Sequence, residues 1–311
     1  MAEQKTPIEV LKKYWGYDSF RFNQEAIISS VLSNNDTLAL LPTGAGKSIC
    51  YQLPALCLPG VCVVISPLIA LMIDQEKALK AREIKVRAIY SGLTNQEIEI
   101  ALNNCLYGKV KILYVSPERI NSRLFISYFE KMNVNLIAVD EAHCISKWGY
   151  DFRPSFLEIA ELRKYHPKAP ILALTATATK QVVNDIQEKL LFKEENCLIS
   201  SFKRKNLVYT VFEESDKLSR IKTITENVGG SGLIYVRSRK KTIELSQTLV
   251  SMGIRATAYH AGLTIPVRNY RQKEWMDDKI DVMVATTAFG MGIDKQNVSY
   301  VIHYDLPESI E

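Results

Sequence analysis

Short runs of apolar, mostly β-branched residues alternate along the chain with longer segments whose apolar residues recur every three or four positions. The short runs are typical of buried strands, and the longer segments are typical of amphipathic helices. The segments LIALMIDQEKALKARE and KQVVNDIQEKLLF are predicted helices of this kind. Such alternation predicts an α/β fold with a mostly parallel sheet and helices on both faces. Between residues 37 and 175 the predicted strands are TLALL, VCVVIS, VRAIY, VKILYVS, VNLIAVD and ILALT.

The pattern weakens over residues 200–207, SSFKRKNL, and then begins again. Gly229, Gly230 and Gly232 stand just before a predicted strand and are interpreted as a turn, because no lysine stands where a phosphate loop would need one. We therefore expect two domains, at residues 1–203 and 204–311. The predicted strands of the second domain are LVYTVF, GLIYV, RATAY, VMVAT and YVIHY.

The composition of the 311 residues is that of a folded protein, with 47% hydrophobic and 23% charged residues. No apolar run approaches the roughly 18 residues that a membrane span needs, and the first residues do not resemble a signal peptide. We expect a cytoplasmic protein without a membrane partner, associated with the nucleoid if it is bacterial. A net charge of +5 permits an anionic partner without requiring one. The spacing of the six cysteines predicts buried thiols rather than a zinc site or disulfides.

The predicted strand TLALL leads directly into PTGAGKS and then into a segment of helical character. Glycines in such a loop let the backbone N–H groups turn toward a polyphosphate, while Lys47 reaches the phosphates and the Ser48 hydroxyl can bind Mg²⁺. Leu41 stands where the strict form of this pattern has a glycine. By itself the loop leaves kinases, GTPases and motor proteins open. The predicted nucleotide contacts in it are Thr43, Gly44, Ala45, Gly46, Lys47 and Ser48.

A second predicted strand, VNLIAVDE, ends in two carboxylates. Asp140 can hold Mg²⁺ through water, and Glu141 can polarise the water that attacks the γ-phosphate. A helix cap or a solvated turn is the alternative for one carboxylate, but a pair that follows a phosphate loop in this order favours a catalytic site. We therefore predict Lys47, Asp140 and Glu141 as catalytic residues, with Ser48 and Asp140 as metal ligands.

Upstream, GYDSFRFNQ offers Tyr17 and Arg21 as stacking faces, and Gln24 can donate to and accept from an adenine edge. A polar, aromatic helix start is the alternative interpretation of this segment. The segments SPLIAL, SPER and LTATAT each follow a predicted strand. In a doubly wound sheet the carboxyl ends of the strands form the ligand-binding edge, so all these motifs are expected at one edge.

Taken in order, these motifs resemble those of the RecQ DNA helicases, which are built from two tandem RecA-like domains. The resemblance covers almost the whole chain, and the aromatic stretch after DEAHCIS sets it apart from the DEAD and DEAH RNA helicases. It implies an ATP-dependent 3′-to-5′ DNA helicase of repair and recombination, with ATP and Mg²⁺ as cofactors and single-stranded and duplex-junction DNA as partners. The segments that carry it are GYDSFRFNQ, LLPTGAGKSICYQLPAL, VISPLIALMIDQ, DEAHCISKWGYDFRP, ALTATAT, IYVRSRK, YHAGL and VATTAFGMGIDKQNV.

The resemblance also implies roles for single residues. Tyr17, Arg21 and Gln24 would hold the adenine. The aromatic-rich loop after the acidic pair would sense single-stranded DNA. The implied DNA-binding residues are His143, Trp148, Phe152, Arg153, Ser238, Arg239, His260 and Thr286, and Gly290, Gly292 and Asp294 belong to the same motifs of the second domain.

The sequence departs from the family pattern at Tyr150, where some members have histidine, and at Gln296, where proline is frequent. Family members continue past the equivalent of Glu311 into a QxxGRxGR helix, whose arginines reach the γ-phosphate. The second domain is therefore expected to be incomplete at its C-terminus. Because such an arginine contributes roughly 10³–10⁵-fold to turnover in related enzymes, we expect ATP binding with poor hydrolysis. An RNA helicase and a non-catalytic, nucleotide-gated clamp on nucleic acid remain alternative functions.

Overall fold

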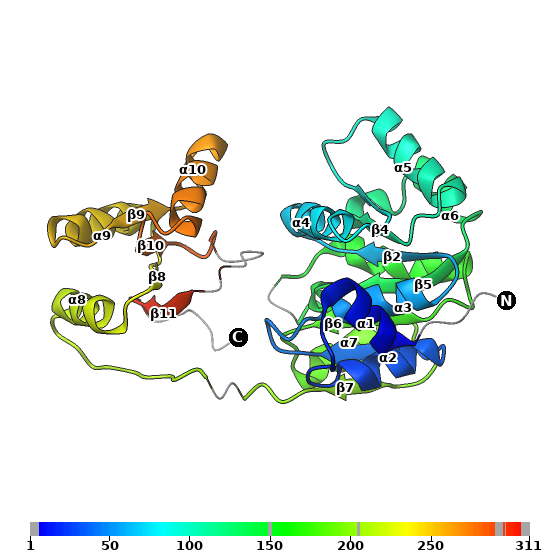
Figure 1. Cartoon of the computed structure of the whole chain (residues 1–311), viewed down its shortest axis with the longest axis horizontal. Helices are drawn as coiled ribbons and strands as arrows, with labels where there is room; N and C mark the ends of the chain where they lie inside the picture. The colour runs from blue at the N-terminus through cyan, green and yellow to red at the C-terminus, as the bar shows by residue number, and fades with distance from the viewer. Residues whose placement is uncertain (1–5, 149–150, 204–205, 290–294, 296, 306–311) are drawn as a thin grey trace. The chain divides into compact units, whose positions relative to one another are not determined.

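A computed structural model describes residues 6–148, 151–203, 206–289, 295 and 297–305. The chain divides into two compact units, residues 1–204 and 205–311, and each unit is described by itself (Figure 1). Among the helices of the described ranges, none is long and apolar enough to cross a membrane. Tyr150, Gln296, Gly290, Gly292 and Asp294, which the sequence analysis singled out, lie outside the described residues.

The first unit is built on a seven-stranded sheet whose neighbouring strands all pair in parallel. The strand order is β3-β4-β2-β5-β6-β1-β7. Because every strand runs in the same direction, the segments that follow the strands all emerge at one edge of the sheet. The strands are β1 (Thr37–Leu40), β2 (Val61–Ile65), β3 (Val86–Ile89), β4 (Ile112–Val115), β5 (Val134–Val139), β6 (Ile171–Thr175) and β7 (Cys197–Ile199).

Helices cover both faces of this sheet, as the apolar runs predicted. In β2, Val61, Val63 and Ile65 belong to one hydrophobic cluster, while Cys62 and Val64 belong to the other. Successive side chains of a strand point to opposite faces, so a strand buried on both faces is apolar throughout. The cluster that contains Val63 also takes side chains from α5 (Asn95–Tyr107), α6 (Arg123–Phe129) and α7 (Lys180–Lys189). The other cluster takes them from α2 (Gln24–Leu32), α3 (Ile49–Cys57) and α4 (Ile69–Lys80).

Shorter segments complete the first unit. Helix α1 (Pro7–Trp15) begins with proline at its first position and ends at Gly16, whose φ of 72° is in the left-handed region typical of helix C-caps. Among the described residues, the 3-10 segments are η1 (Pro117–Arg119), η2 (Ala142–Ile145) and the eleven-residue η3 (Pro154–Lys164).

The second unit has a four-stranded parallel sheet in the order β11-β8-β10-β9. Ile234 of β8 packs with Ile221 of α8 and Leu249 of α9 on one face, and Leu233 packs with Trp275 of α10 on the other. Helices therefore cover both faces here as well. The elements are α8 (Lys217–Val228), β8 (Ser231–Tyr235), α9 (Arg239–Ser251), β9 (Ala256–Tyr259), α10 (Ile265–Met276), β10 (Val282–Ala285) and β11 (Val298–His303).

One predicted strand is wrong and one strand was missed. LVYTVF, residues 207–212, forms no strand, and Val208 and Val211 are 89% and 92% exposed. Its alternating pattern fits a strand, but a strand needs a neighbour to bond with, and the four described strands of the second sheet pair with one another instead. The short strand β7 escaped notice because its sequence, CLI, carries no periodic signal. The other predicted strands are confirmed.

The expected turn before β8 is confirmed at Gly229 and Gly230, whereas Gly232, which was assigned to the same turn, lies within β8. Gly229 and Gly230 have φ angles of 64° and 71°, which favour glycine, and a Cβ on Gly230 would lie 2.3 Å from the Ser299 Oγ. All six cysteines are free thiols.

Candidate functional site

The phosphate loop follows β1, a strand in which every residue is buried, and leads into α3. Gly44 and Gly46 have φ angles of 77° and 75°, a region that costs other residues free energy. A Cβ on Gly46 would lie 2.7 Å from Gln24 Nε2, so a side chain at this position would displace the Gln24 amide. The loop thus places its backbone N–H groups at the start of a helix, where anions are stabilised.

Gln24 is the residue that ties the N-terminal motif to this loop. Its Nε2 donates hydrogen bonds to the carbonyl oxygens of Ala45 at 2.9 Å and Gly46 at 3.1 Å, and its Oε1 accepts one from the Arg21 N–H at 2.9 Å. The side chain is buried, whereas Tyr17 is 45% exposed and carries the Arg21 guanidinium over its ring, 5.1 Å from the centroid. Of the three residues predicted for adenine, Gln24 contacts the phosphate loop directly, Arg21 bonds to Gln24, and Tyr17 stacks against Arg21. The bonds from Gln24 to the loop were not foreseen.

The acidic pair follows β5, next to the end of β2. The Asp140 N–H donates to the Ile65 carbonyl at 2.8 Å, and the Ser66 hydroxyl donates to Asp140 Oδ2 at 3.4 Å. Asp140 is only 8% exposed. Glu141 has a φ of 48°, an unusual value for a residue with a side chain, and it immediately precedes η2. Strained backbone of this kind is concentrated at functional sites.

The electrostatics of the pair suit a bound cation. Burial raises the pKa of Asp140, and burial followed by the Asp140 charge raises the pKa of Glu141 to about 7. The positive charge of Lys47 acts in the opposite direction and lowers both pKa values. Carboxylate and hydroxyl oxygens such as those of Asp140 and Ser48 are the ligands that Mg²⁺ prefers, so the residues present fit this ion.

His143 lies inside the first unit rather than on its surface. It is 3% exposed, and its Nδ1 is 2.9 Å from the Thr175 hydroxyl at the end of β6. Its Nδ1 is also 3.5 Å from Glu141 Oε2. Burial lowers the pKa of His143 to about 4, so the ring is neutral near pH 7. The residue predicted to bind DNA thus contacts the acidic pair and the LTATAT motif.

The loop beyond η2 exposes an aromatic side chain on a fixed base. The Trp148 side chain is 63% exposed, and the backbone N–H of Trp148 donates to the Ser146 hydroxyl at 3.1 Å. Ser146 in turn donates to Asp185 of α7 at 2.7 Å. Phe152 is half-buried with the Lys147 amino group 6.0 Å from its ring centroid.

Arg153 is the best anchored of the residues predicted for this loop. Its guanidinium bonds to Asp151 Oδ2 at 3.0 and 3.2 Å and to the Pro67 carbonyl at 3.3 Å, and its N–H donates to the Cys144 carbonyl at 2.8 Å. Pro67 belongs to the SPLIAL motif, next to Ser66. The loop is therefore connected to the acidic pair both through η2 and through the segment that follows β2.

The predicted residues of the second unit gather at the carboxyl edge of its own sheet. Ser238 caps α9 by accepting the Lys241 N–H at 3.1 Å, and Thr286 donates its N–H to the Tyr259 carbonyl at 3.3 Å. His260 follows β9 and is 6% exposed, and neither of its ring nitrogens has a hydrogen-bond partner among the described residues. Burial, and then the charges of Arg239 and Arg271, lower the pKa of His260.

Sequence reasoning missed a buried polar network behind the phosphate loop. The hydroxyls of Tyr51 in α3 and Tyr114 in β4 are 3.2 Å apart, and Gln52 Nε2 donates to Gln75 Oε1 in α4 at 2.9 Å. Gln52 is also 3.4 Å from the Tyr114 hydroxyl. The signal was available in CYQLPAL, where two polar side chains interrupt an otherwise apolar helix. The network links α3, which follows the phosphate loop, to α4, which begins within SPLIAL.

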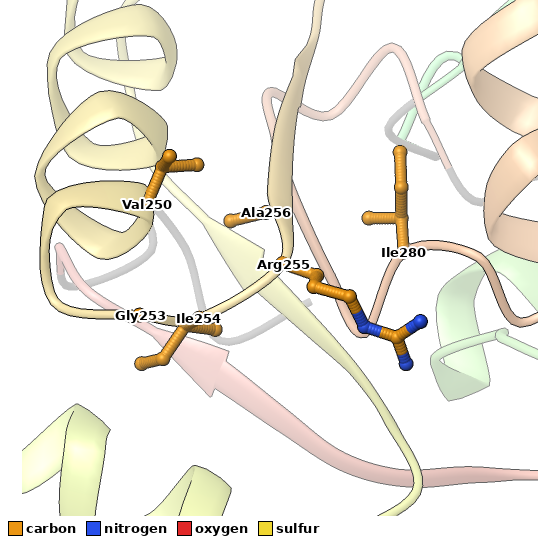
Figure 2. A pocket seen from close by; sticks show the side chains of 6 residues that line it. All are labelled: Val250, Gly253, Ile254, Arg255, Ala256 and Ile280. Carbon is orange, nitrogen blue, oxygen red and sulfur yellow. The ribbon is translucent and has the colours of Figure 1, made fainter.

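A shallow hollow in the second unit lies away from these motifs (Figure 2). It is formed at the amino-terminal ends of β9 and β10, the edge opposite Ser238, His260 and Thr286. Its one charged lining residue, Arg255, already pairs with Asp281. The residues that line it are Val250, Gly253, Ile254, Arg255, Ala256 and Ile280.

Two family models match the chain. The model described as DEAD/DEAH box helicase matches residues 21–186, which is 166 of the 311 residues and so more than half. The model described as helicase conserved C-terminal domain matches residues 215–311. The two matches fall on the two structural units.

Similar proteins agree with these models. The ATP-dependent DNA helicase RecQ of Haemophilus influenzae is 43% identical over 312 residues, which cover 100% of this chain and 50% of that protein. The ATP-dependent DNA helicase RecQ of Bacillus subtilis is 43% identical over 305 residues, which cover 97% of this chain and 52% of that protein. The chain thus spans about half the length of these relatives.

Solved structures share the fold at lower identity. Mycobacterium smegmatis helicase Lhr, bound to ssDNA and AMP-PNP, superposes with a TM-score of 0.70 at 19% identity, covering 97% of this chain and 44% of that one. Saccharomyces cerevisiae dbp5 superposes with a TM-score of 0.73 at 17% identity, covering 97% of this chain and 78% of that one. With two parallel-sheet units, ordered motifs at the strand ends and relatives at 43% identity, the chain belongs to the DEAD/DEAH box helicases and carries a helicase core of the RecQ family.

Proposed function

We propose that the chain binds ATP with Mg²⁺ and couples its hydrolysis to 3′-to-5′ movement along single-stranded DNA, unwinding duplex DNA at junctions during repair and recombination. The observation that carries this proposal is the set of polar contacts that join the buried acidic pair to the aromatic loop of the first unit, through η2 and through Ser66 and Pro67. A site that only hydrolysed nucleotide would not need that connection.

The nucleotide-binding part of the mechanism uses the phosphate loop and the acidic pair. The N–H groups of Gly44, Gly46 and Lys47 and the Lys47 ammonium would bind the phosphates. Ser48 and Asp140 would hold Mg²⁺, which would supply positive charge at the phosphoryl oxygens. Glu141 accepts a proton from the attacking water. Its raised pKa is consistent with this role, because a general base works best when its pKa lies near the working pH.

The coupling between the nucleotide site and the aromatic loop depends on His143 and Arg153. His143 lies between Glu141 and Thr175, so a change at the catalytic carboxylate reaches the end of β6 through two polar contacts. Arg153 holds Asp151 and the SPLIAL segment together, so a base that stacks on the neighbouring aromatic side chains can shift η2. The neutral state of His143 suits this role, since a buried charge would need a fixed partner.

DNA binding is proposed to depend on stacking rather than on sequence-specific recognition of the bases. Trp148, exposed beside a half-buried Phe152, offers a flat apolar face, and stacking on an aromatic side chain tolerates any base. Arg153 supplies positive charge beside that face. In the second unit, Ser238, Arg239, His260 and Thr286 share one sheet edge and are proposed to contact the DNA backbone. An RNA helicase is not favoured, because the relatives at 43% identity are named DNA helicases.

The proposal is tested by measuring ATP hydrolysis with single-stranded DNA and with RNA of matched length and sequence. We expect DNA to stimulate hydrolysis more than RNA at equal concentration. Stimulation by RNA that equals or exceeds stimulation by DNA would support the RNA-helicase alternative. Nucleotide-dependent DNA binding without any hydrolysis would support the clamp.

A further inference from the structure

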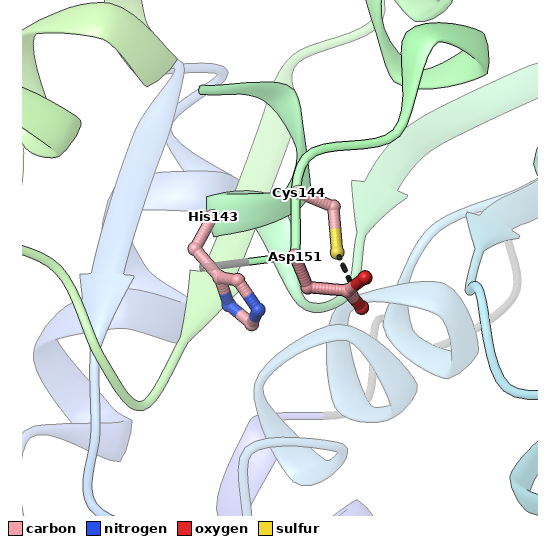
Figure 3. Close-up of side chains that lie close together, drawn as sticks. All are labelled: His143, Cys144 and Asp151. Carbon is pink, nitrogen blue, oxygen red and sulfur yellow. Dashed lines mark hydrogen bonds between the residues drawn. The ribbon is translucent and has the colours of Figure 1, made fainter. Parts of the chain in front are cut away.

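Three side chains with ligand atoms for a metal ion meet between the acidic pair and the aromatic loop. One ligand atom from each of His143, Cys144 and Asp151 lies within 4.8 Å of the others (Figure 3). His143 and Cys144 are buried in η2, and Asp151 reaches them from the loop. None of the three is needed as a metal ligand by the proposed nucleotide site.

The hydrogen bonds of Thr175 determine which ring nitrogen of His143 carries the proton. The Thr175 hydroxyl lies 3.1 Å from the Thr177 carbonyl, to which it can donate, and 2.9 Å from His143 Nδ1. When the hydroxyl donates to the carbonyl it accepts from Nδ1, and in that arrangement of the neutral ring Nε2 carries the lone pair. A metal-binding histidine is commonly held in this way, by a hydrogen bond to the nitrogen that does not bind the metal.

Cys144 and Asp151 are also spaced for a shared ion. The Cys144 Sγ lies 3.7 Å from Asp151 Oδ2, a separation close to that of two ligands on one tetrahedral ion. Arg153 binds the same carboxylate oxygen, Oδ2, through both of its contacts. The carboxylate therefore already holds a cationic group beside the two other ligand atoms.

The geometry points to a binding site for a soft divalent cation of the Zn²⁺ class, held by His143 Nε2, the Cys144 thiolate and Asp151, with water as a fourth ligand. A sulfur, a nitrogen and one carboxylate oxygen select zinc or cobalt over Mg²⁺, which takes oxygen ligands. On binding, the Cys144 S–H bond breaks, the sulfur keeps the electron pair and binds the ion, and the proton passes to the buffer.

Occupancy of this site would fix the loop, because the ion joins Asp151 directly to two residues of η2. It would also compete with Arg153 for the Asp151 carboxylate. This consequence rests on the proposed function, in which movement of the loop transmits DNA binding to Glu141. Zn²⁺ is therefore expected to inhibit the stimulation of ATP hydrolysis by DNA, while the binding of the ion itself does not depend on that function.

The test titrates the protein, purified without added metal, with Co²⁺ in the presence of excess Mg²⁺. We expect one equivalent of Co²⁺ to produce a thiolate charge-transfer band and tetrahedral visible bands, and Zn²⁺ to abolish both. In Cys144→Ser the hydroxyl can still donate a hydrogen bond to Asp151. This variant should lose the charge-transfer band and bind Co²⁺ at least about tenfold more weakly. Cys105→Ser is the matched control, because Cys105 is also buried and burial raises the pKa of both thiols to about 12.

Several results would overturn the site: no charge-transfer band in the wild type, a band that persists in Cys144→Ser, or a band lost equally in Cys105→Ser. Asp151→Asn provides a second test with the thiol intact, and undiminished Co²⁺ affinity in that variant would also contradict the site. If the protein binds Co²⁺ as expected but DNA does not stimulate its ATP hydrolysis, the proposed function fails and the cation site stands.

Discussion

Replacement of Gln24 by alanine tests how the phosphate loop is held before nucleotide binds. The substitution removes the two hydrogen bonds that Nε2 donates to Ala45 and Gly46, and with them the acceptor for the Arg21 N–H. Gln24 is only 4% exposed, and Ala45 is 1% exposed, so water cannot easily replace the lost donor. The substituted loop therefore keeps its sequence but loses the contacts that fix its backbone.

The number of hydrogen bonds removed sets the expected loss of stability and of nucleotide affinity. A hydrogen bond contributes about 0.5–1.5 kcal/mol net, so the two bonds to the loop carbonyls correspond to about 1–3 kcal/mol of unfolding free energy. If ordering the loop around a phosphate costs this same free energy in the variant, nucleotide affinity falls roughly 5- to 150-fold. Gln24→Glu is expected to be at least as harmful, because an ionised carboxylate would face two carbonyl oxygens without a hydrogen to donate.

Two measurements check the prediction: urea unfolding for stability, and titration with a fluorescent ATP analogue for affinity. Gln187→Ala is the matched control, since Gln187 is also buried but accepts the Asn196 N–H at 2.8 Å, away from the loop. The control should lose stability and keep its nucleotide affinity. If folded Gln24→Ala binds the analogue as tightly as the wild type does, Gln24 does not organise the loop and the reasoning is wrong.

Three further predictions follow from other contacts. Lys47→Ala should abolish measurable binding of the ATP analogue with normal unfolding, and unchanged affinity would contradict the phosphate-loop assignment. Asp36→Ala should cost about 3–5 kcal/mol in urea unfolding, because it leaves the Arg163 guanidinium, 2.8 Å from Asp36, nearly buried without its carboxylate; a loss below about 1 kcal/mol would refute this. Hydrogen bonds from Lys295, Asn297 and Ser231 hold the pKa of Asp278 at about 2, below its usual value near 3.8. The unfolded chain then binds more protons, so stability from this group is present above pH 4 and lost as the pH falls toward 2, a loss that Asp278→Asn should reduce in thermal melts.

Much of the fold was predictable because it depends on patterns that are local in sequence. Strands buried on both faces must be apolar throughout, so runs such as VCVVIS are clear signals, and the motifs that follow them must then share one edge. LVYTVF carries the same local signal but is no strand here, because strand formation also depends on a partner that no local pattern specifies. The prediction of a strand over LVYTVF was wrong because the local pattern does not determine which strands pair.

The site was predictable where chemistry dictates residue type and spacing. A polyphosphate requires glycine and lysine in a fixed order, and both glycines of the loop have the expected positive φ. The contacts of Gln24 and His143 were not predictable, because they join segments 21 and 32 residues apart in the chain. His143 was placed on the DNA side by its position in a motif, whereas its actual partners depend on how η2 packs against β6.

In the proposed mechanism, DNA that binds the aromatic loop raises the rate of ATP hydrolysis at the acidic pair. The most direct test is to measure DNA stimulation of ATP hydrolysis in Trp148→Ala. Stacking contributes about 1–3 kcal/mol per base, so half-maximal stimulation should need roughly 5- to 150-fold more single-stranded DNA, with hydrolysis in the absence of DNA unchanged. Tyr107→Ala is the control, because Tyr107 is 79% exposed but precedes β4 at the opposite edge of the sheet. The account predicts a shift in Trp148→Ala alone. Equal DNA dependence in the wild type and both variants would contradict it.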